Sequence, residues 1–508
     1  MWFILLSLTS CTPTSVVDKA PQDTAALDSG QDDSGESGES GDPADSGDSG
    51  DSGDSADSAD SGDSGGSGDS GDSDPTGGSF PAESSVSDAL VRVASRLDNT
   101  DLGRVLHVGD VDGDGQDDVV AATFMANSRT GGAYAVPGPL TSGGVVEDLG
   151  WHLEGALRGT GTGRSMSLGD VDGDGYLDVG LGAPYDPDDN GLYLAAGPVS
   201  ADVDLAEVPL LRGPYTSYAG HGSDLRGDLD DDGVDDVVVG AYYTGLSRGL
   251  TFIAFGPVAE DLNLEDEADV TPVGEASNVY AGRSIRSGPD LDGDGVDDLV
   301  IAALGTMSVS GSGGFYVLYG PLSGNIDLGD ADGRYAGENT SGNAGLWLDA
   351  GDVSGDGLAD VVTSGFDSTL APSGGAAYVV FGPAADEDVL TDADIVVRGD
   401  EAEQYGGGVA VGDLDADGVD ELLLGAQGDS TEGRSAGALY LFQDPVPGSY
   451  VFTDGDAAFY AESEGDNLGA GAAVGDVDGD GVPEIVIGAP YQDDLAATSG
   501  AFYVMHAE

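Results

Sequence analysis

One acidic motif returns seven times in this sequence, about sixty residues apart, and it limits the possible folds more than any other feature. The intervals between the first aspartates of successive copies are 60, 58, 62, 62, 61 and 63 residues. These aspartates are Asp110, Asp170, Asp228, Asp290, Asp352, Asp413 and Asp476. Self-similarity at a fixed period identifies a repeat array in which each copy forms one structural unit.

A second landmark follows the acidic motif by about 28 residues in five copies: a run of apolar and aromatic residues that ends in Gly-Pro. Its glycines are Gly138, Gly197, Gly256, Gly320 and Gly382. The sixth copy reads LYLFQDP here, and the seventh reads AFYVMHAE. Short apolar runs bounded by Gly, Pro, Asp and Asn, without helical periodicity, predict strands. Four strands in each repeat make one blade, so the sequence predicts an all-β, seven-bladed β-propeller.

The ring is predicted to be closed by residues 89–96. In the other copies a strand-like segment follows the second landmark, whereas the seventh copy ends at Glu508 without one. The segment before the first acidic motif, ALVRVASRLDNTDLGRVLHVGD, has the layout of the missing piece. We therefore expect residues 89–96 to form the outer strand of the last blade.

The acidic motif has the form D-x-D-x-D-G-x-x-D, with carboxylates at positions 1, 3, 5 and 9. Carboxylates this close together repel one another unless a cation neutralises them. A backbone carbonyl at position 7 adds to an all-oxygen ligand set, which suits Ca²⁺, and glycine at position 6 allows the sharp turn. The sequence therefore predicts up to seven calcium sites in β-hairpin loops. The alternative is that these acidic turns only contact water.

The predicted ligands occupy positions 1, 3, 5, 7 and 9 of each loop. In the first four loops they are Asp110, Asp112, Asp114, Gln116, Asp118, Asp170, Asp172, Asp174, Tyr176, Asp178, Asp228, Asp230, Asp232, Val234, Asp236, Asp290, Asp292, Asp294, Val296 and Asp298. In the last three they are Asp352, Ser354, Asp356, Leu358, Asp360, Asp413, Asp415, Asp417, Val419, Glu421, Asp476, Asp478, Asp480, Val482 and Glu484. Because Ser354 removes one charge, we expect the fifth loop to bind calcium most weakly. Glu421 and Glu484 are longer than aspartate and can still reach the ion.

Two other kinds of metal site are disfavoured. An EF-hand needs a glutamate at position 12 between two helices, but position 12 is Ala121 in the first loop and Leu181 in the second. Zinc sites are built from cysteine and histidine. Cys11 is the only thiol, and the histidines form no cluster in the sequence: His107, His152, His221 and His506.

The first eleven residues resemble a bacterial lipoprotein signal. The apolar run 2–8 is too short to span a bilayer, and it leads into Leu8-Thr9-Ser10-Cys11, which is similar to a lipobox. We expect residues 1–10 to be a cleaved signal peptide and Cys11 to be lipidated. This predicts the bacterial cell envelope as the location, either as an outer-membrane lipoprotein or as a surface-exposed or secreted protein. An ordinary signal peptide, or an incidental cysteine, is the alternative.

Residues 11–84 are predicted to be a lipidated cysteine and a disordered acidic linker, and residues 85–508 the propeller. Residues 21–80 hold 17 acidic residues and no basic one, with too few apolar side chains to offset the entropy of ordering. The whole chain has 96 acidic and 15 basic residues, a formal net charge of −81. This balance excludes nucleic acid as a default partner and electrostatic docking to anionic lipids, so a membrane contact is expected only through the lipid anchor.

The repeats resemble FG-GAP repeats of the integrin α-subunit propeller. The resemblance covers about 420 residues and rests on the acidic loop and on a trailing Gly-Ala-Pro, kept at 182–184 and 488–490 and in part at 240–241 and 425–426. The Phe-Gly element before the loop is mostly replaced by Gly-Ala or Gly-Arg. The resemblance implies that calcium loops on one face stiffen the hairpins and that a partner binds the opposite face.

These features predict a calcium-stabilised, non-enzymatic surface binding or adhesion module for a protein or glycan partner. Two other functions stay open: a structural envelope or calcium-buffering protein, and a polysaccharide-acting enzyme on a propeller scaffold. No loop combines His, Tyr and basic residues in an unusual insertion, so no catalytic residue is predicted. Two Arg-Gly-Asp strings, at 226–228 and 398–400, are expected by chance in a chain so rich in Gly and Asp.

Overall fold

The computed structural model describes residues 80–506, except 125, 127–129, 187–188, 306–312, 339–342, 367–373, 386 and 400–405. The predicted signal peptide, Cys11 and the linker up to residue 79 lie outside the described residues. These residues belong to the compact unit that follows Gly71.

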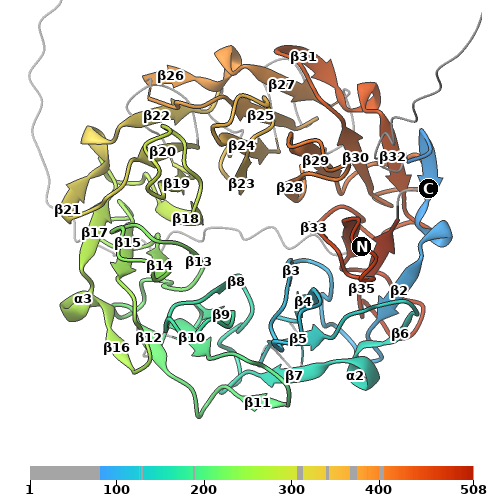
Figure 1. Ribbon diagram of the computed structural model, residues 1–508, viewed down its shortest axis with the longest axis horizontal. Helices are drawn as coiled ribbons and strands as arrows, with labels where there is room; N and C mark the ends of the chain where they lie inside the picture. Colours follow the sequence, from blue (N-terminus) through green and yellow to red (C-terminus); the bar gives the residue numbers. More distant parts are fainter. Residues whose placement is uncertain are drawn as a thin grey trace, which may run out of the picture. The chain divides into compact units, whose positions relative to one another are not determined.

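The described chain forms seven five-stranded sheets arranged in a ring (Figure 1). The inner strands are β3 (Leu106–Gly109), β8 (Met166–Gly169), β13 (Gly222–Gly227), β18 (Ala281–Ser287), β23 (Trp347–Gly351), β28 (Val409–Gly412) and β33 (Ala472–Gly475). Each inner strand contacts the inner strands on both sides, and β33 contacts β3, so the ring is complete. The predicted seven-bladed β-propeller is confirmed.

Three further antiparallel strands follow outward in each sheet. The second strands are β4 (Asp118–Ala122), β9 (Asp178–Ala183), β14 (Asp236–Ala241), β19 (Leu299–Ala303), β24 (Asp360–Gly365), β29 (Glu421–Ala426) and β34 (Glu484–Ala489). The third strands are β5 (Gly132–Val136), β10 (Gly191–Ala195), β15 (Leu250–Ala254), β20 (Gly314–Leu318), β25 (Ala376–Val380), β30 (Ala438–Phe442) and β35 (Ala501–Met505). The fourth strands are β7 (Trp151–Glu154), β12 (Leu210–Arg212), β17 (Val270–Val273), β22 (Gly333–Ala336), β27 (Ile395–Arg398), β32 (Ala457–Tyr460) and β2 (Val91–Ala94).

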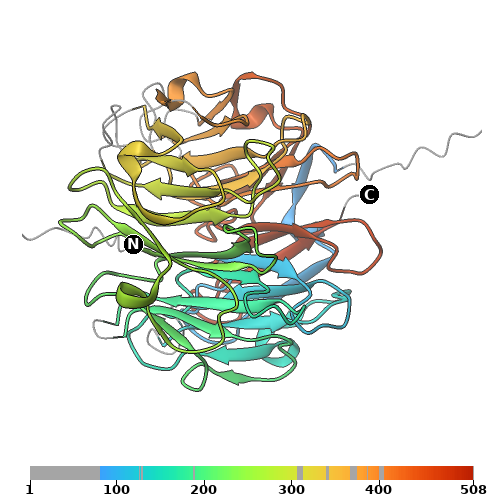
Figure 2. The same cartoon turned by 60° about the vertical axis from the view of Figure 1, so that its left-hand side comes forward.

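The segment predicted at 89–96 is found as β2, which pairs antiparallel with β35 and aligns Val91 with Val504. Figure 2 shows this blue N-terminal strand against the red C-terminal end of the chain. The two ends of the repeat array therefore share one sheet, and about 400 residues of chain lie between hydrogen-bonded partners such as Ala94 and Ala501.

A fifth strand, which the sequence reasoning missed, runs parallel to the fourth at the outer edge of each sheet. These strands are β11 (Val203–Asp204), β16 (Leu262–Asn263), β21 (Gly324–Asp327), β26 (Glu387–Val389), β31 (Gly448–Val451), β1 (Glu83–Ser85) and β6 (Gly144–Val145). Each comes from the segment that then enters the fourth strand of the next sheet, so it ties neighbouring sheets together. Because β1 begins at Glu83 and Phe80 packs edge-on against Phe459, the folded part starts earlier than the predicted boundary at residue 85.

Six single helical turns lie on the outer rim of the ring. The turns are α2 (Val146–Leu149), α3 (Leu264–Glu267), η1 (Val86–Asp88), η2 (Leu328–Asp330), η3 (Leu390–Asp392) and η4 (Phe452–Asp454). None of the helices in this part of the chain has the length and apolar character needed to cross a membrane.

The hydrophobic core is divided into seven clusters, one at each junction between neighbouring sheets. The cluster that joins the seventh sheet to the first contains Phe502 and Val486 together with Leu106 and Tyr134. Second strands are buried along their whole length, as in β9 and β34, because a sheet covers each of their faces. This explains why these strands read as continuous apolar runs rather than as alternating ones.

The glycine of the trailing Gly-Ala-Pro motif marks a close approach between sheets. A Cβ atom on Gly488 of β34 would lie 1.7 Å from the carbonyl oxygen of Gly103, which belongs to the segment before β3. Backbone of one sheet therefore touches backbone of the next here, and only glycine leaves enough space.

Candidate metal centres

The acidic loops join the end of each inner strand to the start of the second strand, so all seven lie at the same end of the ring. The first loop connects β3, which ends at Gly109, to β4, which starts at Asp118. Strands flank every loop, and the prediction of β-hairpin loops rather than EF-hands is confirmed. Glycine at position 6 has φ between 88° and 92° in all seven loops, a left-handed conformation that glycine adopts without steric strain.

The aspartate at position 1 organises each turn through hydrogen bonds to the backbone. In the first loop, Asp110 Oδ1 accepts from the N–H groups of Gly113 and Asp114 at 2.8 and 3.1 Å, and Oδ2 accepts from that of Gly115 at 2.9 Å. The carboxylate at position 3 accepts from the N–H of position 5, as Asp112 does from Asp114 at 3.0 Å. These contacts hold the acidic side chains over the turn.

The carboxylate at position 9 connects the two sequence landmarks. In the first repeat, Asp118 Oδ2 accepts from the N–H of Val111 at 3.1 Å, and Oδ1 accepts from the N–H of Gly138 at 2.9 Å. Gly138 is the glycine of the Gly-Pro landmark. The same bond joins Asp178 to Gly197, Asp236 to Gly256, Asp298 to Gly320 and Asp360 to Gly382. The Gly-Pro turn therefore fixes the innermost acidic side chain of the neighbouring loop.

Burial makes these position-9 carboxyl groups weaker acids, because it raises their pKa. Desolvation raises the pKa of Asp118 and Asp178 to about 6, and that of Asp236, Asp298 and Asp360 to about 7, with neighbouring aspartates adding to the rise. Hydrogen bonds from the backbone oppose this rise without cancelling it. A bound cation would reverse the effect, because it favours the ionised form of each carboxylate around it.

The sixth and seventh loops replace aspartate at position 9 with glutamate, and both repeats lack the Gly-Pro landmark. Glu421 Oε2 accepts from the N–H of Leu414 at 2.6 Å, and Glu484 Oε2 accepts from that of Val477 at 3.0 Å. Desolvation raises the pKa of Glu421 to about 7. In the seventh loop, the role of the missing glycine N–H is taken by His506, whose Nδ1 lies 2.9 Å from Glu484 Oε1.

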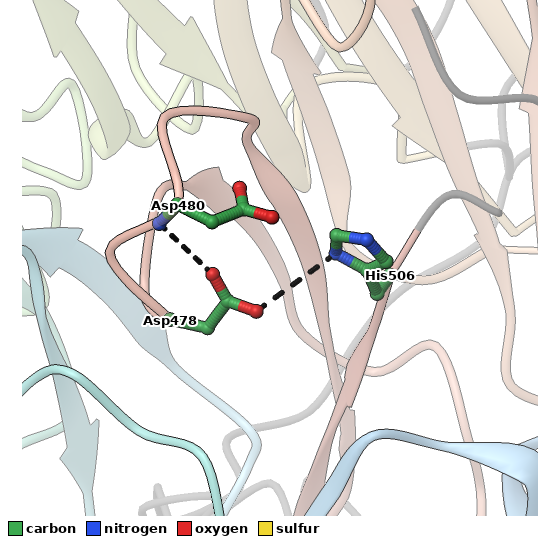
Figure 3. Close-up of side chains that lie close together, drawn as sticks. All are labelled: Asp478, Asp480 and His506. Atoms are coloured by element: carbon green, nitrogen blue, oxygen red, sulfur yellow. Dashed lines mark hydrogen bonds and ion pairs between the residues drawn. The ribbon is translucent and has the colours of Figure 1, made fainter.

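His506 also lies beside the other carboxylates of the seventh loop (Figure 3). Its Nδ1 is 4.0 Å from Asp478 Oδ2, and Asp478, Asp480 and His506 form one of the groups able to hold a metal ion. The contact with Glu484 raises the pKa of His506. The sequence reasoning gave this histidine no site role, because it is two residues from the end of the chain and far from the motif in sequence.

The acidic side chains could hold a divalent cation. In the first three loops, the groups whose ligand atoms lie within 4.8 Å of one another combine positions 1, 3 and 9. Their members are Asp110, Asp112, Asp118, Asp170, Asp172, Asp178, Asp228, Asp230 and Asp236. In the fourth loop the group is Asp290, Asp292 and Asp294. Clusters of carboxylate oxygen alone fit Ca²⁺ or Mg²⁺ better than softer metals.

Position 7 enters the turn through its backbone. The N–H of Gln116 donates to Asp114 Oδ1 at 2.9 Å, and the equivalent bond is present at Tyr176 and Val482. The role predicted for its carbonyl as a metal ligand stays a prediction. In the fifth loop the N–H of Ser354 donates to Asp360 Oδ2 at 2.8 Å, so the turn is built despite the missing carboxylate. Its weaker calcium affinity also stays a prediction.

A further acidic position, which the sequence reasoning did not single out, joins neighbouring loops. The aspartate at position 8 accepts a hydrogen bond from the N–H of position 1 in the preceding sheet. Asp235 Oδ2 accepts from Asp170 at 2.8 Å, and Asp117 Oδ2 accepts from Asp476 at 3.2 Å across the closure of the ring. Asp297 and Asp420 do the same for the fourth and sixth sheets. The signal in the sequence is a second acid directly before position 9 in four loops.

Comparison with known proteins agrees with this geometry. A family model described as "FG-GAP repeat" matches residues 281–318, 405–442 and 468–505. Each match starts at or just before an inner strand and ends in the third strand of the same sheet. Three of the seven sheets therefore match the FG-GAP repeat model.

Integrin α subunits are similar to part of the chain. Integrin alpha-V of Gallus gallus is 30% identical over 223 residues, which is 42% of this chain and 21% of the integrin. Integrin alpha-5 of Xenopus laevis is 29% identical over 224 residues, with the same shares covered. Integrin alpha-IIb of Homo sapiens is 36% identical over 154 residues, which is 28% of this chain and 15% of the integrin. The chain thus spans about a fifth of the length of these relatives.

A solved structure, that of the V. cholerae biofilm matrix protein Bap1, covers 83% of this chain and 91% of its own, with 12% identity and a TM-score of 0.35.

Proposed function

We propose that this chain is a calcium-stabilised, non-enzymatic binding module of the cell-adhesion type, which recognises a protein or glycan partner at a cell surface. The observation that carries the proposal is the set of seven hairpins in which buried carboxylates lie over one turn at the same end of the ring. The FG-GAP repeats and the similarity to integrin α subunits support an adhesion role. The partner face is the end of the ring opposite the acidic loops.

In this proposal, bound calcium stabilises the fold. The loop carboxylates at positions 1, 3, 5 and 9 would hold the ion, with His506 next to the seventh site. A bound ion removes the repulsion between these side chains and offsets the desolvation of position 9. Because the assembled loops exist only in the native hairpins, calcium binding would be linked to folding.

The test is binding of the labelled full chain to intact cells, in millimolar calcium and in EDTA. We expect calcium-dependent retention on the cells and its loss with chelator. A variant with Asp170, Asp228 and Asp290 changed to Asn should behave like the chelated protein. Equal retention in calcium and in EDTA, with the protein folded in both, would contradict the proposal, as would turnover of a cell-surface polysaccharide.

The proposed location is the bacterial cell envelope, with Cys11 as a lipid anchor. The support is the lipobox-like string that ends at this single cysteine. Two or three acyl chains hold a protein firmly on a bilayer, whereas one does not. The Cys11→Ser variant should therefore be released into the soluble fraction, and mass spectrometry of the wild-type N-terminal peptide should show added acyl mass. An unmodified Cys11 in the cell-associated protein would contradict the anchor.

A further inference from the structure

A cavity of about 670 Å³ follows the ring axis and is lined by the inner strands of all seven sheets. Although the chain has only 15 basic residues, five arginines line this cavity: Arg104, Arg164, Arg226, Arg283 and Arg286. A third of the basic residues thus faces one internal space in a protein of net charge −81. Three of the five, Arg104, Arg164 and Arg283, directly follow a left-handed glycine that recurs in the repeats.

The arginines toward the acidic end of the cavity are neutralised by the protein itself. Arg226 Nε lies 2.9 Å from Asp224 Oδ1, and Arg286 Nε lies 2.9 Å from Asp349 Oδ1. Ser167 Oγ donates to Asp224 Oδ1 at 2.7 Å. These charges are balanced where they lie and need no ligand.

Toward the opposite end, two arginines have no such balance. Arg164 precedes β8 by two residues and Arg283 is near the start of β18; neither forms an ion pair with a carboxylate in the part of the chain that the structure describes. Arg164 lies over the ring of Phe124 at 5.7 Å and Arg283 over that of Tyr242 at 5.9 Å. Burial and the nearby Arg164 lower the pKa of Arg283 to about 9. Two partly buried cations close together favour an anion between them.

A neutral hydrogen-bonding group lies beside the two cations. His221 lines the cavity, is 5% exposed, and its Nδ1 has no hydrogen-bond partner among the described residues. Burial, together with Arg283 and Arg164, lowers its pKa well below the ordinary value, so the imidazole is uncharged at neutral pH. The neutral ring of His221 therefore adds no charge that would compete with the two arginines for an anion.

A cluster of tyrosine rings packs around His221 beside this end of the cavity. Tyr242 is 5.0 Å from His221 between ring centroids and 5.7 Å from Tyr218, with which it stacks. Tyr243 stacks with Tyr280 at 6.1 Å and is 51% exposed. Tyrosine rings offer apolar faces together with hydroxyl groups, a combination suited to a ligand that is apolar on one side and polar on the other.

We propose that this mouth, built by Arg164, Arg283, His221 and the tyrosines packed around it, binds a carboxylated saccharide, with the carboxylate between the arginines. The inference deepens the proposed function by naming the chemistry of the partner, and it rests on that function for its biological setting. Sugar rings present C–H faces that pack on tyrosine and, in uronic acids, one carboxylate for the arginines. A volume of about 670 Å³ is within the range of small-ligand sites.

The position of this mouth, at the end of the ring opposite the acidic loops, also fits the proposal. β9 starts at Asp178 in the second acidic loop and ends at Ala183, two residues before Tyr185, whose ring lies 6.1 Å from Tyr218 and 6.4 Å from His221. Six residues of strand extend roughly 20 Å. The arginine-tyrosine mouth and the acidic loops are therefore at opposite ends of the same strands, so an anionic ligand can approach without meeting the acidic end.

The test is calorimetric titration of the full chain, in a fixed calcium concentration, with a trisaccharide of uronic acid and with the same trisaccharide after reduction of its carboxyl groups. We expect the acidic form to bind and the reduced form to bind at least about tenfold more weakly. The double variant Arg164→Gln/Arg283→Gln should lose a similar factor. The control Arg434→Gln, an exposed arginine without a carboxylate partner in the described residues, should not change the affinity.

Three results would overturn the inference: equal binding of the acidic and reduced trisaccharides, no binding of either, or unchanged affinity in the double variant. Tighter binding of a tetraglutamate peptide than of the uronic acid would overturn the saccharide assignment. If the double variant does not fold, the comparison of the two trisaccharides on the wild-type chain still decides. Failure of this inference is separable from failure of the proposed function, because calcium-dependent retention on cells could persist without any affinity for the trisaccharide, and the reverse.

Discussion

The two ends of the ring are built from the same strands but follow different rules. At one end, seven loops repeat one turn, with glycine at φ near 90° in every copy and a buried carboxylate held by backbone N–H groups. At the other end a glycine with φ between 81° and 87° precedes each of Arg164, His221 and Arg283 in three consecutive sheets, so the turn repeats while the side chain after it changes. The acidic end thus keeps its side chains from repeat to repeat, whereas the opposite end keeps the turn and varies the side chain that follows it.

At the acidic end, the residue at position 9 and the group that contacts it differ together between repeats. Aspartate at position 9 occurs with the Gly-Pro landmark, and glutamate occurs where that landmark is missing. In the seventh sheet, His506 supplies the contact that glycine N–H supplies elsewhere. The hydrogen-bond geometry around the buried carboxylate is thus kept while the residues that provide it differ.

The largest expected difference between the two ends concerns removal of cations. Stripping calcium should lower the free energy of unfolding by about 2.7 kcal/mol for each site that had been saturated at a hundred times its Kd. Urea unfolding in calcium and after chelation measures this. The Arg164→Gln variant is the control for the opposite end, and it should change both curves equally. An identical unfolding midpoint with and without calcium would show that the acidic end needs no cation.

The second expected effect is a pH dependence confined to the acidic end. In the cation-free protein, burial holds the pKa of Asp178 at about 6 and that of Asp236 at about 7, above the unfolded value of about 3.9. The folded state then binds more protons, so its stability falls as pH rises from about 4 to about 7. Calcium competes with these protons and opposes the fall.

The stability difference between calcium-loaded and stripped protein should therefore grow from about pH 5 to about pH 7.5. Unfolding curves of both forms at the two pH values measure it. Buried histidines such as His107, whose pKa burial lowers to about 4, act in both forms and cancel from the difference. A difference that stays constant with pH would mean that the position-9 carboxylates do not contact the ion.

A smaller effect concerns the contacts between neighbouring loops. Asp235→Ala leaves the half-buried N–H of Asp170 without its acceptor and should lower the free energy of unfolding by about 1–2 kcal/mol. Asp235→Asn keeps an oxygen at this place and should lower it by less than about 0.5 kcal/mol. Denaturant unfolding at constant calcium measures both. Equal losses in the two variants would assign the effect to the negative charge instead of the hydrogen bond.

The smallest expected effect is a gain. Ala416 is at position 4 of the sixth loop with φ of 63°, where most other loops have glycine. A left-handed conformation costs a non-glycine residue roughly 1 kcal/mol, so Ala416→Gly should raise stability by up to about that amount. Thermal unfolding in calcium measures this, with Gly418→Ala as the opposite change at position 6 of the same loop. A loss of stability in Ala416→Gly would show that the loop gains more from a stiff residue than it loses to strain.

The sequence predicted the repeated parts of this molecule well. The strand content, the number of sheets and the hairpin loops all follow from short-range patterns. Because these patterns occur seven times, they are not chance features of the composition. The closing strand could be placed because its layout matched a segment missing elsewhere. The fifth strands were missed because two to four residues at an outer edge leave no periodic signal of their own.

The contacts between sheets could not be predicted. Asp117 and Asp476 are 359 residues apart, and nothing local in either loop indicates that one accepts a hydrogen bond from the other. The acidic residue at position 8 was visible, but its partner depends on how neighbouring sheets lie in the ring. The same holds for His506, which approaches Glu484 only because β35 pairs with β34.

The sequence alone determined seven β-rich units, each with an acidic turn, because a turn and its two strands are specified by residues within about fifteen positions of one another. Only the tertiary structure decided which arginines are balanced by carboxylates and which are not. Arg226 lies within β13, two residues after its partner Asp224, whereas Arg164 lies in the turn before β8 and Arg286 pairs with Asp349 of the next sheet. Charge balance inside a ring depends on side chains brought together from several sheets, so it is a property of the closed ring.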